Sequence, residues 1–271
     1  MEKGYQIISV NNILYSCGSK AQRNGEQFID VHVLGFVLTG ELHLTTPEKV
    51  IIMKAGSMGL IKRNQLVKAT KVPPPGGEFS SINIFLTQDI LRKYISEIPQ
   101  DITGKTHGES FFEIQKDALL KAYFQSLQPY FQAPERFTPQ LAELKTREAF
   151  ELILNIEPEL KEVLFDFSEP HKIDLEAFMH QNYMFNVSID GLAKLTGRSR
   201  AGFKRDFEKI FRTSPGQWIK QKRLEQAYYL IKEKGIKPSN AYLDVGFENL
   251  SHFSYAFKQA FGINPSSLLH A

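Results

Sequence analysis

The same helical pattern occurs twice in the C-terminal third of the chain, and it restricts the possible folds more than any other feature. Three phenylalanines recur at four-residue spacing, and a proline follows each trio. The two copies are Phe203, Phe207, Phe211 and Pro215, and then Phe253, Phe257, Phe261 and Pro265. Side chains four residues apart lie on one face of a helix, and an apolar face of this kind must be buried. We therefore predict two matching helices whose phenylalanines form hydrophobic cores and not a cofactor site.

A shorter helix and a glycine-containing turn are predicted in front of each aromatic helix. The first copy has Ser188 as a cap, a helix over 189–195, a turn at 196–198 and Ser199 as the next cap; the second has a helix over 238–244, a turn at 245–247 and Asn249 as the cap. A short helix, a tight turn and a longer helix form the helix-turn-helix pattern, whose second helix enters the major groove of DNA. The repeat therefore predicts two helix-turn-helix units, at about 188–211 and 238–261.

A further helix is predicted between the two units, from Pro215 to Lys234, because apolar residues recur along one of its faces. Its length would be about 30 Å at 1.5 Å per residue. One turn of B-DNA measures roughly 34 Å, so a connector of this length lets both recognition helices reach successive major-groove segments of one duplex.

Basic residues are concentrated in the same part of the chain. Residues 171–271 contain 15 Lys and Arg against 9 Asp and Glu, whereas residues 1–170 contain 18 against 21. A basic segment suits a polyanionic partner. An excess of this size is equally consistent with a solvated surface, so the charge supports DNA binding only together with the repeat.

The exposed sides of the two aromatic helices are the predicted DNA-contacting surfaces, although a solvated helix face is the alternative. Arg205 is the strongest candidate for a two-bond contact to guanine, and Lys204 for a base or a phosphate. The second unit has few charges, which favours reading through hydroxyl groups and apolar contacts. The predicted DNA-binding residues are Arg198, Ser199, Arg200, Ala201, Lys204 and Arg205 in the first unit, and Asn249, Leu250, Ser251, His252, Ser254, Tyr255 and Lys258 in the second.

At these residues the sequence resembles the AraC/XylS family of bacterial transcription regulators. The resemblance covers about 175–268, and the segments Ala241–Phe247, Ser251–Ser254 and Phe257–Ser266 carry its most specific part. It implies two helix-turn-helix units joined by one helix, in a regulator that binds double-stranded DNA, contacts RNA polymerase and more often activates than represses. Tyr255 departs from the family pattern, in which a basic residue is frequent at this position.

The first part of the chain has the pattern of short strands, and the part after Thr87 has that of helices. β-branched and aromatic residues dominate 28–37, short alternation marks 79–86, and apolar residues continue the pattern at Leu42, Leu44 and 50–52. Turn-forming residues at 40–41, 46–48 and 55–57 break these runs, which predicts a small barrel or sandwich. The predicted fold class is therefore α+β and multidomain. The predicted boundaries are a regulatory domain over 1–168, with a barrel at about 1–87 and helices at about 88–167, and an all-α DNA-binding domain over 171–271.

The segments Val37–Leu42 and Lys54–Ser57 look like the cupin-type barrel common in this family's regulatory domains. By this resemblance, the helices after the barrel, residues 138–156 especially, pack on it and can form a homodimer interface. Metal-binding cupins need clustered histidines, whereas His32 and His43 lie eleven residues apart without a paired acid. We therefore expect both histidines to be structural and no metal or other cofactor to be bound.

Other functions stay open from the sequence alone. The chain could be a cupin-type enzyme or ligand-binding protein with an accessory helical domain, or its N-terminal domain could bind a protein instead of a small molecule. Because the sequence lacks a Gly-x-Ser-x-Gly motif, a glycine-rich phosphate loop and a His-Glu-x-x-His motif, we expect no catalytic residues and no enzyme. The single cysteine, Cys17, and the lack of a bilayer-spanning apolar run favour a cytoplasmic protein without membrane association.

Overall fold

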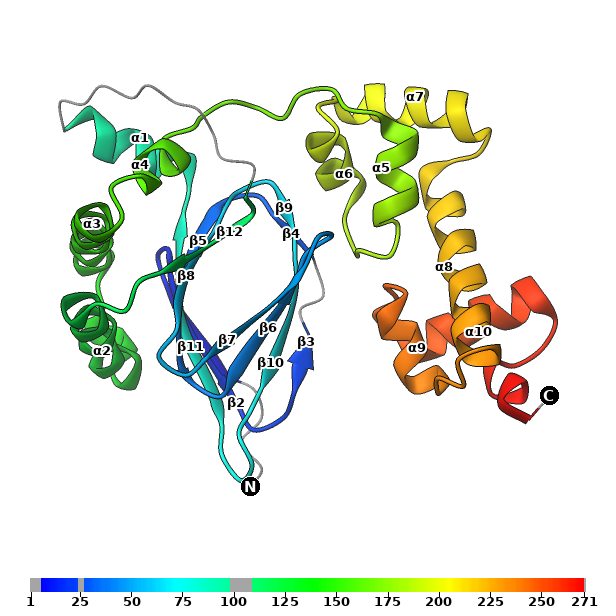
Figure 1. Ribbon diagram of the computed structural model, residues 1–271, viewed down its shortest axis with the longest axis horizontal. Coiled ribbons are helices and arrows are strands. Elements are labelled where there is room, and N and C mark those ends of the chain that lie inside the picture. The colour runs from blue at the N-terminus through cyan, green and yellow to red at the C-terminus, as the bar shows by residue number, and fades with distance from the viewer. Residues whose placement is uncertain (1–5, 24–26, 98–108, 271) are drawn as a thin grey trace. The chain divides into compact units, whose positions relative to one another are not determined.

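The computed structural model describes residues 6–23, 27–97 and 109–270. It divides into two compact units (Figure 1). The N-terminal unit comprises Met1–Asn24 and Ile29–Ser168, and the C-terminal unit comprises Gly25–Phe28 and Glu169–Ala271. The N-terminal unit is rich in sheet and the C-terminal unit is helical, so the chain has the mixed α and β content that its sequence predicts.

The strands of the N-terminal unit form two larger sheets and one short pair. The first sheet has the order β1 (Gln6–Val10), β2 (Ile13–Gly18), β11 (Phe79–Leu86), β5 (His32–Thr39), β8 (Met58–Ile61) and β12 (Phe111–Ile114). The second has the order β3 (Gln22–Arg23), β10 (Lys68–Val72), β6 (Glu41–Thr45) and β7 (Val50–Lys54), while β4 (Phe28–Ile29) pairs with β9 (Gln65–Leu66). The neighbours in the two larger sheets are antiparallel.

The predicted barrel differs from this arrangement, because the described strands do not close into a single sheet. The six-stranded sheet ends in β1 and β12, and the four-stranded sheet ends in β3 and β7. The strands β3, β4 and β9 are only two residues long. Pairs this short do not join the two larger sheets into one hydrogen-bonded ring.

Turn-forming residues separate the strands where the sequence predicts breaks. Gly40 connects β5 to β6 with φ of +79°, and a Cβ atom there would lie 2.5 Å from the carbonyl oxygen of Val72. Between β6 and β7, the hydroxyl of Thr46 accepts hydrogen bonds from the backbone N–H groups of Glu48 and Lys49 at 3.3 and 3.1 Å. These local bonds set the strand register on either side of each turn.

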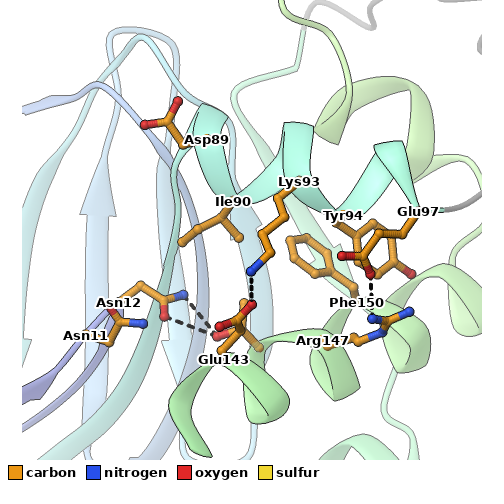
Figure 2. Close-up of a pocket in the computed structure, with 11 residues that line it drawn as sticks. Asn11, Asn12, Asp89, Ile90, Lys93, Tyr94, Glu97, Glu143, Arg147 and Phe150 are labelled. Atoms are coloured by element: carbon orange, nitrogen blue, oxygen red, sulfur yellow. Dashed lines mark hydrogen bonds and ion pairs between the residues drawn. The ribbon is translucent and has the colours of Figure 1, made fainter. Parts of the chain in front are cut away.

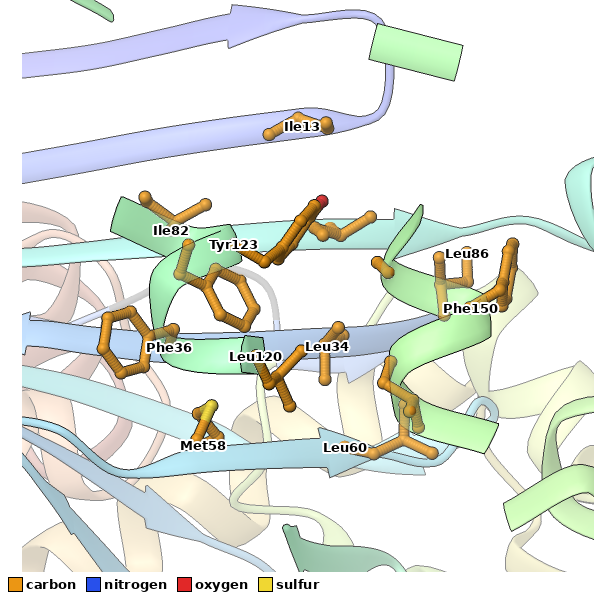
Figure 3. Close-up of a cluster of buried hydrophobic side chains, with 14 of the residues drawn as sticks. Ile13, Leu34, Phe36, Met58, Leu60, Ile82, Leu86, Leu120, Tyr123 and Phe150 are labelled. Carbon is orange, nitrogen blue, oxygen red and sulfur yellow. The ribbon is translucent and has the colours of Figure 1, made fainter. Parts of the chain in front are cut away.

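The larger of two hydrophobic clusters in the described part of the N-terminal unit lies between the six-stranded sheet and the helices that follow it in the chain (Figure 3). The helices are α1 (Gln88–Ser96), α2 (Ala118–Gln132), α3 (Pro139–Ile156) and α4 (Leu160–Leu164), with a 3-10 turn at Pro134–Arg136. Phe36 of β5 stacks on Phe124 of α2 with ring centroids 4.9 Å apart, and Phe150 of α3 is 1% exposed. Burial of each such ring stabilises the fold by about 1.5–3 kcal/mol, which holds the helices against the sheet.

The C-terminal unit contains six α-helices in its described residues. They are α5 (Leu175–Asn182), α6 (Ile189–Leu195), α7 (Arg200–Phe211), α8 (Pro215–Lys232), α9 (Pro238–Asp244) and α10 (Leu250–Phe261), followed by a 3-10 helix at Pro265–His270. Figure 1 shows α8 leading from the group α5–α7 to the group α9–α10. Each group has its own buried cluster, and α8 supplies residues to both. The bounds confirm the predicted short helices at 189–195 and 238–244, and the connector ends two residues earlier than predicted.

Candidate nucleic-acid interface

Two helix-turn-helix units are built in the C-terminal unit, one from α6 and α7 and the other from α9 and α10. Each turn contains a glycine with a backbone conformation that other residues rarely adopt. Gly197 has φ of +63°, and a Cβ atom there would lie 2.3 Å from the backbone of His171. Gly246 has φ of +92°, and its Cβ atom would lie 2.6 Å from the carbonyl oxygen of Met184. Both turns therefore need glycine for conformation and for space.

Side-chain caps fix where the helices of these units begin. Ser188, Ser199 and Asn249 each accept a hydrogen bond from the backbone N–H three residues further on, at 3.1, 3.1 and 3.0 Å. These are the caps that the sequence predicts. Each contributes about 1 kcal/mol and orders the first turn of its helix.

The aromatic trios form the cores of the two units, with one difference from the prediction. The first two rings of each trio are 0% exposed; these are Phe203 and Phe207, and Phe253 and Phe257. The third ring of each trio is only half-buried, because it lies at the last turn of its helix. Phe211 packs on Trp218 of α8 at 4.6 Å between ring centroids, and Phe261 packs on Tyr228 of the same helix at 5.0 Å. Both recognition helices are thus held against α8.

The first recognition helix, α7, carries basic side chains on its exposed face. The side chain of Arg205 is 80% exposed, with its Nε atom 3.6 Å from Oδ1 of the neighbouring Asp206. The side chain of Arg200 is 61% exposed and its Nη1 atom lies 3.3 Å from Oδ2 of Asp190. Ion pairs at this level of exposure contribute little to stability, so both guanidinium groups can exchange their partners for DNA. Also exposed are Ser199, Ala201 and Lys204.

Arg198 has a different environment from the other basic residues predicted at this surface. Its side chain is 8% exposed and donates a hydrogen bond from Nε to Oδ2 of Asp206 at 3.1 Å. Its Nη1 atom donates to the carbonyl oxygens of Ile173 and Thr196 at 3.0 and 2.7 Å. The hydrogen bonds from Arg198 and Lys172 lower the pKa of the Asp206 carboxyl. Arg198 therefore stabilises the turn in front of α7.

The second recognition helix, α10, exposes apolar and uncharged groups. Tyr255 is 67% exposed and Leu250 is 39% exposed. Ser251, His252 and Lys258 are also exposed, and Ser254 is half-buried. The fifty-residue offset of the repeat aligns Leu250 with Arg200 and Tyr255 with Arg205. Two guanidinium groups of the first unit are thus replaced by apolar side chains in the second.

Arg223 of α8 connects the two helix-turn-helix units, and sequence reasoning did not identify it. Its Nε and Nη2 atoms donate to the carbonyl oxygens of Tyr183 and Phe185, before the first unit, at 2.8 and 2.7 Å. Its Nη1 atom donates to the carbonyl oxygen of Gly246, in the turn of the second unit, at 2.8 Å. Burial lowers the pKa of Arg223 to about 10, so the guanidinium stays charged at neutral pH. No local signal marks this role, because all three acceptors are backbone carbonyl oxygens of residues distant in the sequence.

Other contacts reinforce this connection. The Nδ2 atom of Asn186 donates to Oε1 of Glu248 at 2.5 Å, again joining the segment before α6 to the turn before α10. The close approach of Gly246 to Met184 leaves no room for a side chain between them. The two helix-turn-helix units are therefore held together by hydrogen bonds and by backbone packing as well as by the helix α8.

Two families match the chain, and together they cover most of it. The ExsA N-terminal regulatory domain matches residues 32–163, and a helix-turn-helix domain matches residues 192–271. The chain belongs to the AraC family of transcription regulators. The helix-turn-helix match begins inside α6 and contains the remaining helices of the DNA-binding unit, so the family assignment and the geometry agree.

Several bacterial regulators are similar to this AraC-type chain. The uncharacterized HTH-type transcriptional regulator YbfI of Bacillus subtilis is 26% identical over 236 residues, which are 85% of this chain and 82% of that protein. The transcriptional regulator ExsA of Pseudomonas aeruginosa is 28% identical over 131 residues, 47% of each chain. The virulence regulon transcriptional activator VirF of Yersinia enterocolitica is 27% identical over 92 residues, 34% of each chain. The regulator thus spans less than half of ExsA and VirF in these matches.

Solved structures of transcription regulators also match the chain, at modest TM-scores. An apo form of ToxT from Vibrio cholerae strain SCE256 is 13% identical, with a TM-score of 0.47, and the match covers 96% of this chain and 98% of that chain. A probable AraC family regulator from Rhodopseudomonas palustris is 32% identical, with a TM-score of 0.32, over 35% of this chain and 91% of that chain.

The regulatory unit of this AraC-type protein contains a pocket of about 270 Å³ between α1, α3 and the turn that joins β1 to β2 (Figure 2). Apolar side chains, Ile90, Tyr94 and Phe150, form much of its lining, and burial raises the pKa of Tyr94 to about 12, so its hydroxyl stays neutral. Within the pocket the Nδ2 atom of Asn12 donates to the hydroxyl of Thr146 at 3.1 Å. The pocket therefore combines an apolar surface with a buried polar pair.

Two ion pairs join α1 to α3 at the edge of this pocket. Lys93 pairs with Glu143, and Nη1 of Arg147 lies 2.6 Å from Oε2 of Glu97. All four side chains are between 41% and 63% exposed, so each pair is open to exchange with a charged molecule. Figure 2 shows the two pairs side by side between the two helices.

The two histidines considered as metal ligands lie in separate environments. His32 is 0% exposed, its Nδ1 atom accepts a hydrogen bond from the backbone N–H of Arg63 at 3.3 Å, and burial lowers its pKa to about 3. The Nε2 atom of His43 lies 2.8 Å from Oε2 of Glu41. Arg63 itself donates from Nε and Nη2 to the carbonyl oxygen of Asp166, at 3.2 and 2.9 Å, and so holds the end of the N-terminal unit.

Among residues 6–23, 27–97 and 109–270, no group of three His, Cys, Asp or Glu side chains is placed to hold a metal ion. Within the same ranges, no helix combines the length and the apolar character that crossing a bilayer requires.

Proposed function

We propose that this AraC-type regulator binds a two-part operator, with α7 and α10 in successive major grooves of one duplex. The proposed contact residues are Ser199, Arg200, Ala201, Lys204, Arg205, Asn249, Leu250, Ser251, His252, Ser254, Tyr255 and Lys258, while Arg198 acts by stabilising the turn before α7. The observation that carries the proposal is the three-carbonyl contact of Arg223, since it ties both units to one helix. The 18 residues of α8 span about 27 Å, near the roughly 34 Å between successive turns of B-DNA.

Titration of selected DNA with the full chain at several salt concentrations tests this proposal. Neutralised phosphates release counterions, so the logarithm of the binding constant falls linearly with the logarithm of the salt concentration. We expect a steep slope together with a preference for one two-part sequence over scrambled DNA of the same length. A shallow slope and equal affinity for both DNAs would favour the alternative, a cupin-type enzyme or ligand-binding protein with an accessory helical domain.

Several finer aspects belong to the same proposal. The regulator activates transcription through RNA polymerase in the cytoplasm, without acting as an enzyme. Its similarity to the transcriptional activator VirF supports the direction of regulation. The two antiparallel sheets of the N-terminal unit make an open, cupin-like arrangement, for which the glycine turn at Gly40 between β5 and β6 is the support. A homodimer forms through α3, whose Leu144 is 63% exposed. A reporter gene behind the selected operator measures whether transcription is activated. The Leu144→Glu variant tests whether the homodimer forms through α3.

We further propose that the pocket between α1 and α3 takes the signal that the N-terminal unit senses. Four of the five charged side chains that line it form the two ion pairs, and the fifth is the carboxylate of Asp89. A ligand with both a positive and a negative group can replace the partners in these pairs, and its positive group can also approach Asp89. The apolar lining then suits an apolar body, and the ligand class is a small apolar amino acid or a similar zwitterion.

Thermal unfolding of the full chain in a series of apolar L-amino acids tests this pocket. The double variant Lys93→Glu with Glu143→Lys provides the control, because it keeps an ion pair in the same place and reverses its charges. We expect one amino acid to raise the Tm of the natural chain and to lose that effect in the double variant. Equal behaviour of both chains in every amino acid would point to a protein partner at the N-terminal unit instead.

A further inference from the structure

The two recognition helices present different chemistry at equivalent positions. Where α7 has the exposed cations Arg200 and Arg205, α10 has Leu250 and Tyr255. We propose that α10 reads thymine through its C5-methyl group, with Tyr255 and Leu250 as specificity-determining residues, whereas α7 reads guanine. This inference rests on the proposed function and assigns a base chemistry to each half of the operator.

Tyr255 lies on the outward face of α10. The buried residues of this helix are Phe253, Ala256 and Phe257. At 3.6 residues per turn, Ser251 and Tyr255 point away from that buried side, together with Lys258 one turn later. The side chain of Tyr255 is therefore directed where a recognition helix meets the groove.

Tyr255 is also free of intramolecular partners in the part of the chain that the structure describes. Tyr255 is 67% exposed, and its side chain forms neither a ring contact nor a hydrogen bond with any described residue. Leu250, the first residue of α10, exposes 39% of its surface at the end of the helix that approaches base edges first. Exposed apolar groups at such a position gain by burial, and DNA is the surface that the proposed function brings there.

The base edges determine which partner these side chains can prefer. In the major groove only thymine presents a methyl group, whereas guanine presents two acceptors that suit a guanidinium group. The outward groups in the first two turns of α10 include no formal positive charge, and Lys258 lies a turn beyond Tyr255. The hydroxyls of Ser251 and Ser254 can bond to several bases and so add little preference. The apolar contact is then the main source of discrimination in this half.

Replacement of thymine by deoxyuridine tests the inference directly, because it removes only the methyl group. The operator is first selected from random DNA with the full chain, and the half read by α7 is identified as the half whose base preference changes in Arg205→Ala. Each thymine in the other half is then replaced singly. Burial of one methyl group corresponds to about a fourfold change in affinity. We expect about this loss at one or two thymines of the α10 half and no loss at thymines of the α7 half.

Two variants of Tyr255 complete the test. Tyr255→Phe keeps the ring and should keep the thymine preference, whereas Tyr255→Arg restores the chemistry of the first unit and should shift the preference at that position toward guanine. Unchanged affinity for every deoxyuridine operator would overturn the inference. An equal loss of affinity for all sequences in Tyr255→Phe would also overturn it, since the hydroxyl would then contact a phosphate. If selection yields no preferred sequence at all, the proposed function itself fails, which is a separate result.

Discussion

The two helix-turn-helix units of this regulator have the same construction and different surfaces. Each has a short helix, a glycine turn, a capped recognition helix and two fully buried phenylalanines in a cluster to which α8 contributes. The outward residues differ, because α7 presents Arg200 and Arg205 where α10 presents Leu250 and Tyr255. The repeat therefore preserves the residues that form the cores, while the exposed residues of the two recognition helices differ.

The largest effect is expected when the shared core is disturbed. Phe203→Ala and Phe253→Ala each remove a fully buried ring and should lower the free energy of unfolding by about 3–5 kcal/mol. Trp218, the single tryptophan, packs near Phe207 and Phe211, so its fluorescence reports on the first core. In urea unfolding followed by this fluorescence, we expect Phe203→Ala to shift the midpoint more than Phe253→Ala. Ile210→Ala, at a residue 40% exposed, serves as the control. Identical shifts for both phenylalanine variants would show that the two cores unfold as one.

A smaller loss is expected when the connection between the units is removed. Arg223→Met leaves three carbonyl oxygens without their donor and should lower the free energy of unfolding by about 3 kcal/mol. The affinity of the variant should also depend less on the spacing between the two operator halves than the affinity of the natural chain does. Lys222→Met removes one charge from a half-buried position of the same helix, where Nζ lies 3.0 Å from Oε2 of Glu225, and should change neither property appreciably. A stable Arg223→Met protein with unaltered spacing preference would remove Arg223 from the positioning role.

An effect of intermediate size is expected at the surface where the units differ. Arg205→Ala should weaken operator binding by about 1–3 kcal/mol and reduce the preference at one base position, because a guanidinium contact to guanine is lost. Lys209→Ala, in the last turn of the same helix, should lower affinity slightly and equally for all sequences. Competition binding with operators that vary at each position distinguishes the two results. Unchanged preference in Arg205→Ala would mean that the first unit does not read guanine through this residue.

The smallest effect should be the same in both units. Ser199→Ala and Asn249→Ala each remove a cap and should lower the free energy of unfolding by about 1 kcal/mol. Chemical denaturation of the two variants measures this loss. A loss of affinity for DNA much larger than the loss of stability, in one unit only, would show that its cap residue also contacts DNA.

The architecture of the C-terminal unit could be predicted in detail because its signals are local. Caps, turn glycines and four-residue spacing act within a few residues of one another, so Ser188, Ser199 and Asn249 could be identified as caps. The connection through Arg223 could not, because its partners lie 23 to 40 residues away and are backbone carbonyls, which leave no mark in the sequence.

The N-terminal unit shows the same limit for sheets. The strand β11 was predictable over Phe79–Leu86 from its composition and alternation. The separation into a six-stranded and a four-stranded sheet depends on pairings between distant strands, and the glycine spacing that suggests a barrel carries no information about them. The ion pair at the edge of the pocket could not be predicted for the same reason, since Lys93 and Glu143 meet only when α1 packs beside α3.

The dependence of binding on half-site spacing tests most directly whether the two recognition helices act as one rigid pair. The full chain would be titrated with operators in which one to six base pairs are inserted between the halves. A pair held by α8 and Arg223 predicts a sharp optimum of affinity at one spacing. Once about half a helical turn has been added, the affinity should fall to that of a single half-site. Equal affinity across these spacings would contradict the proposed arrangement.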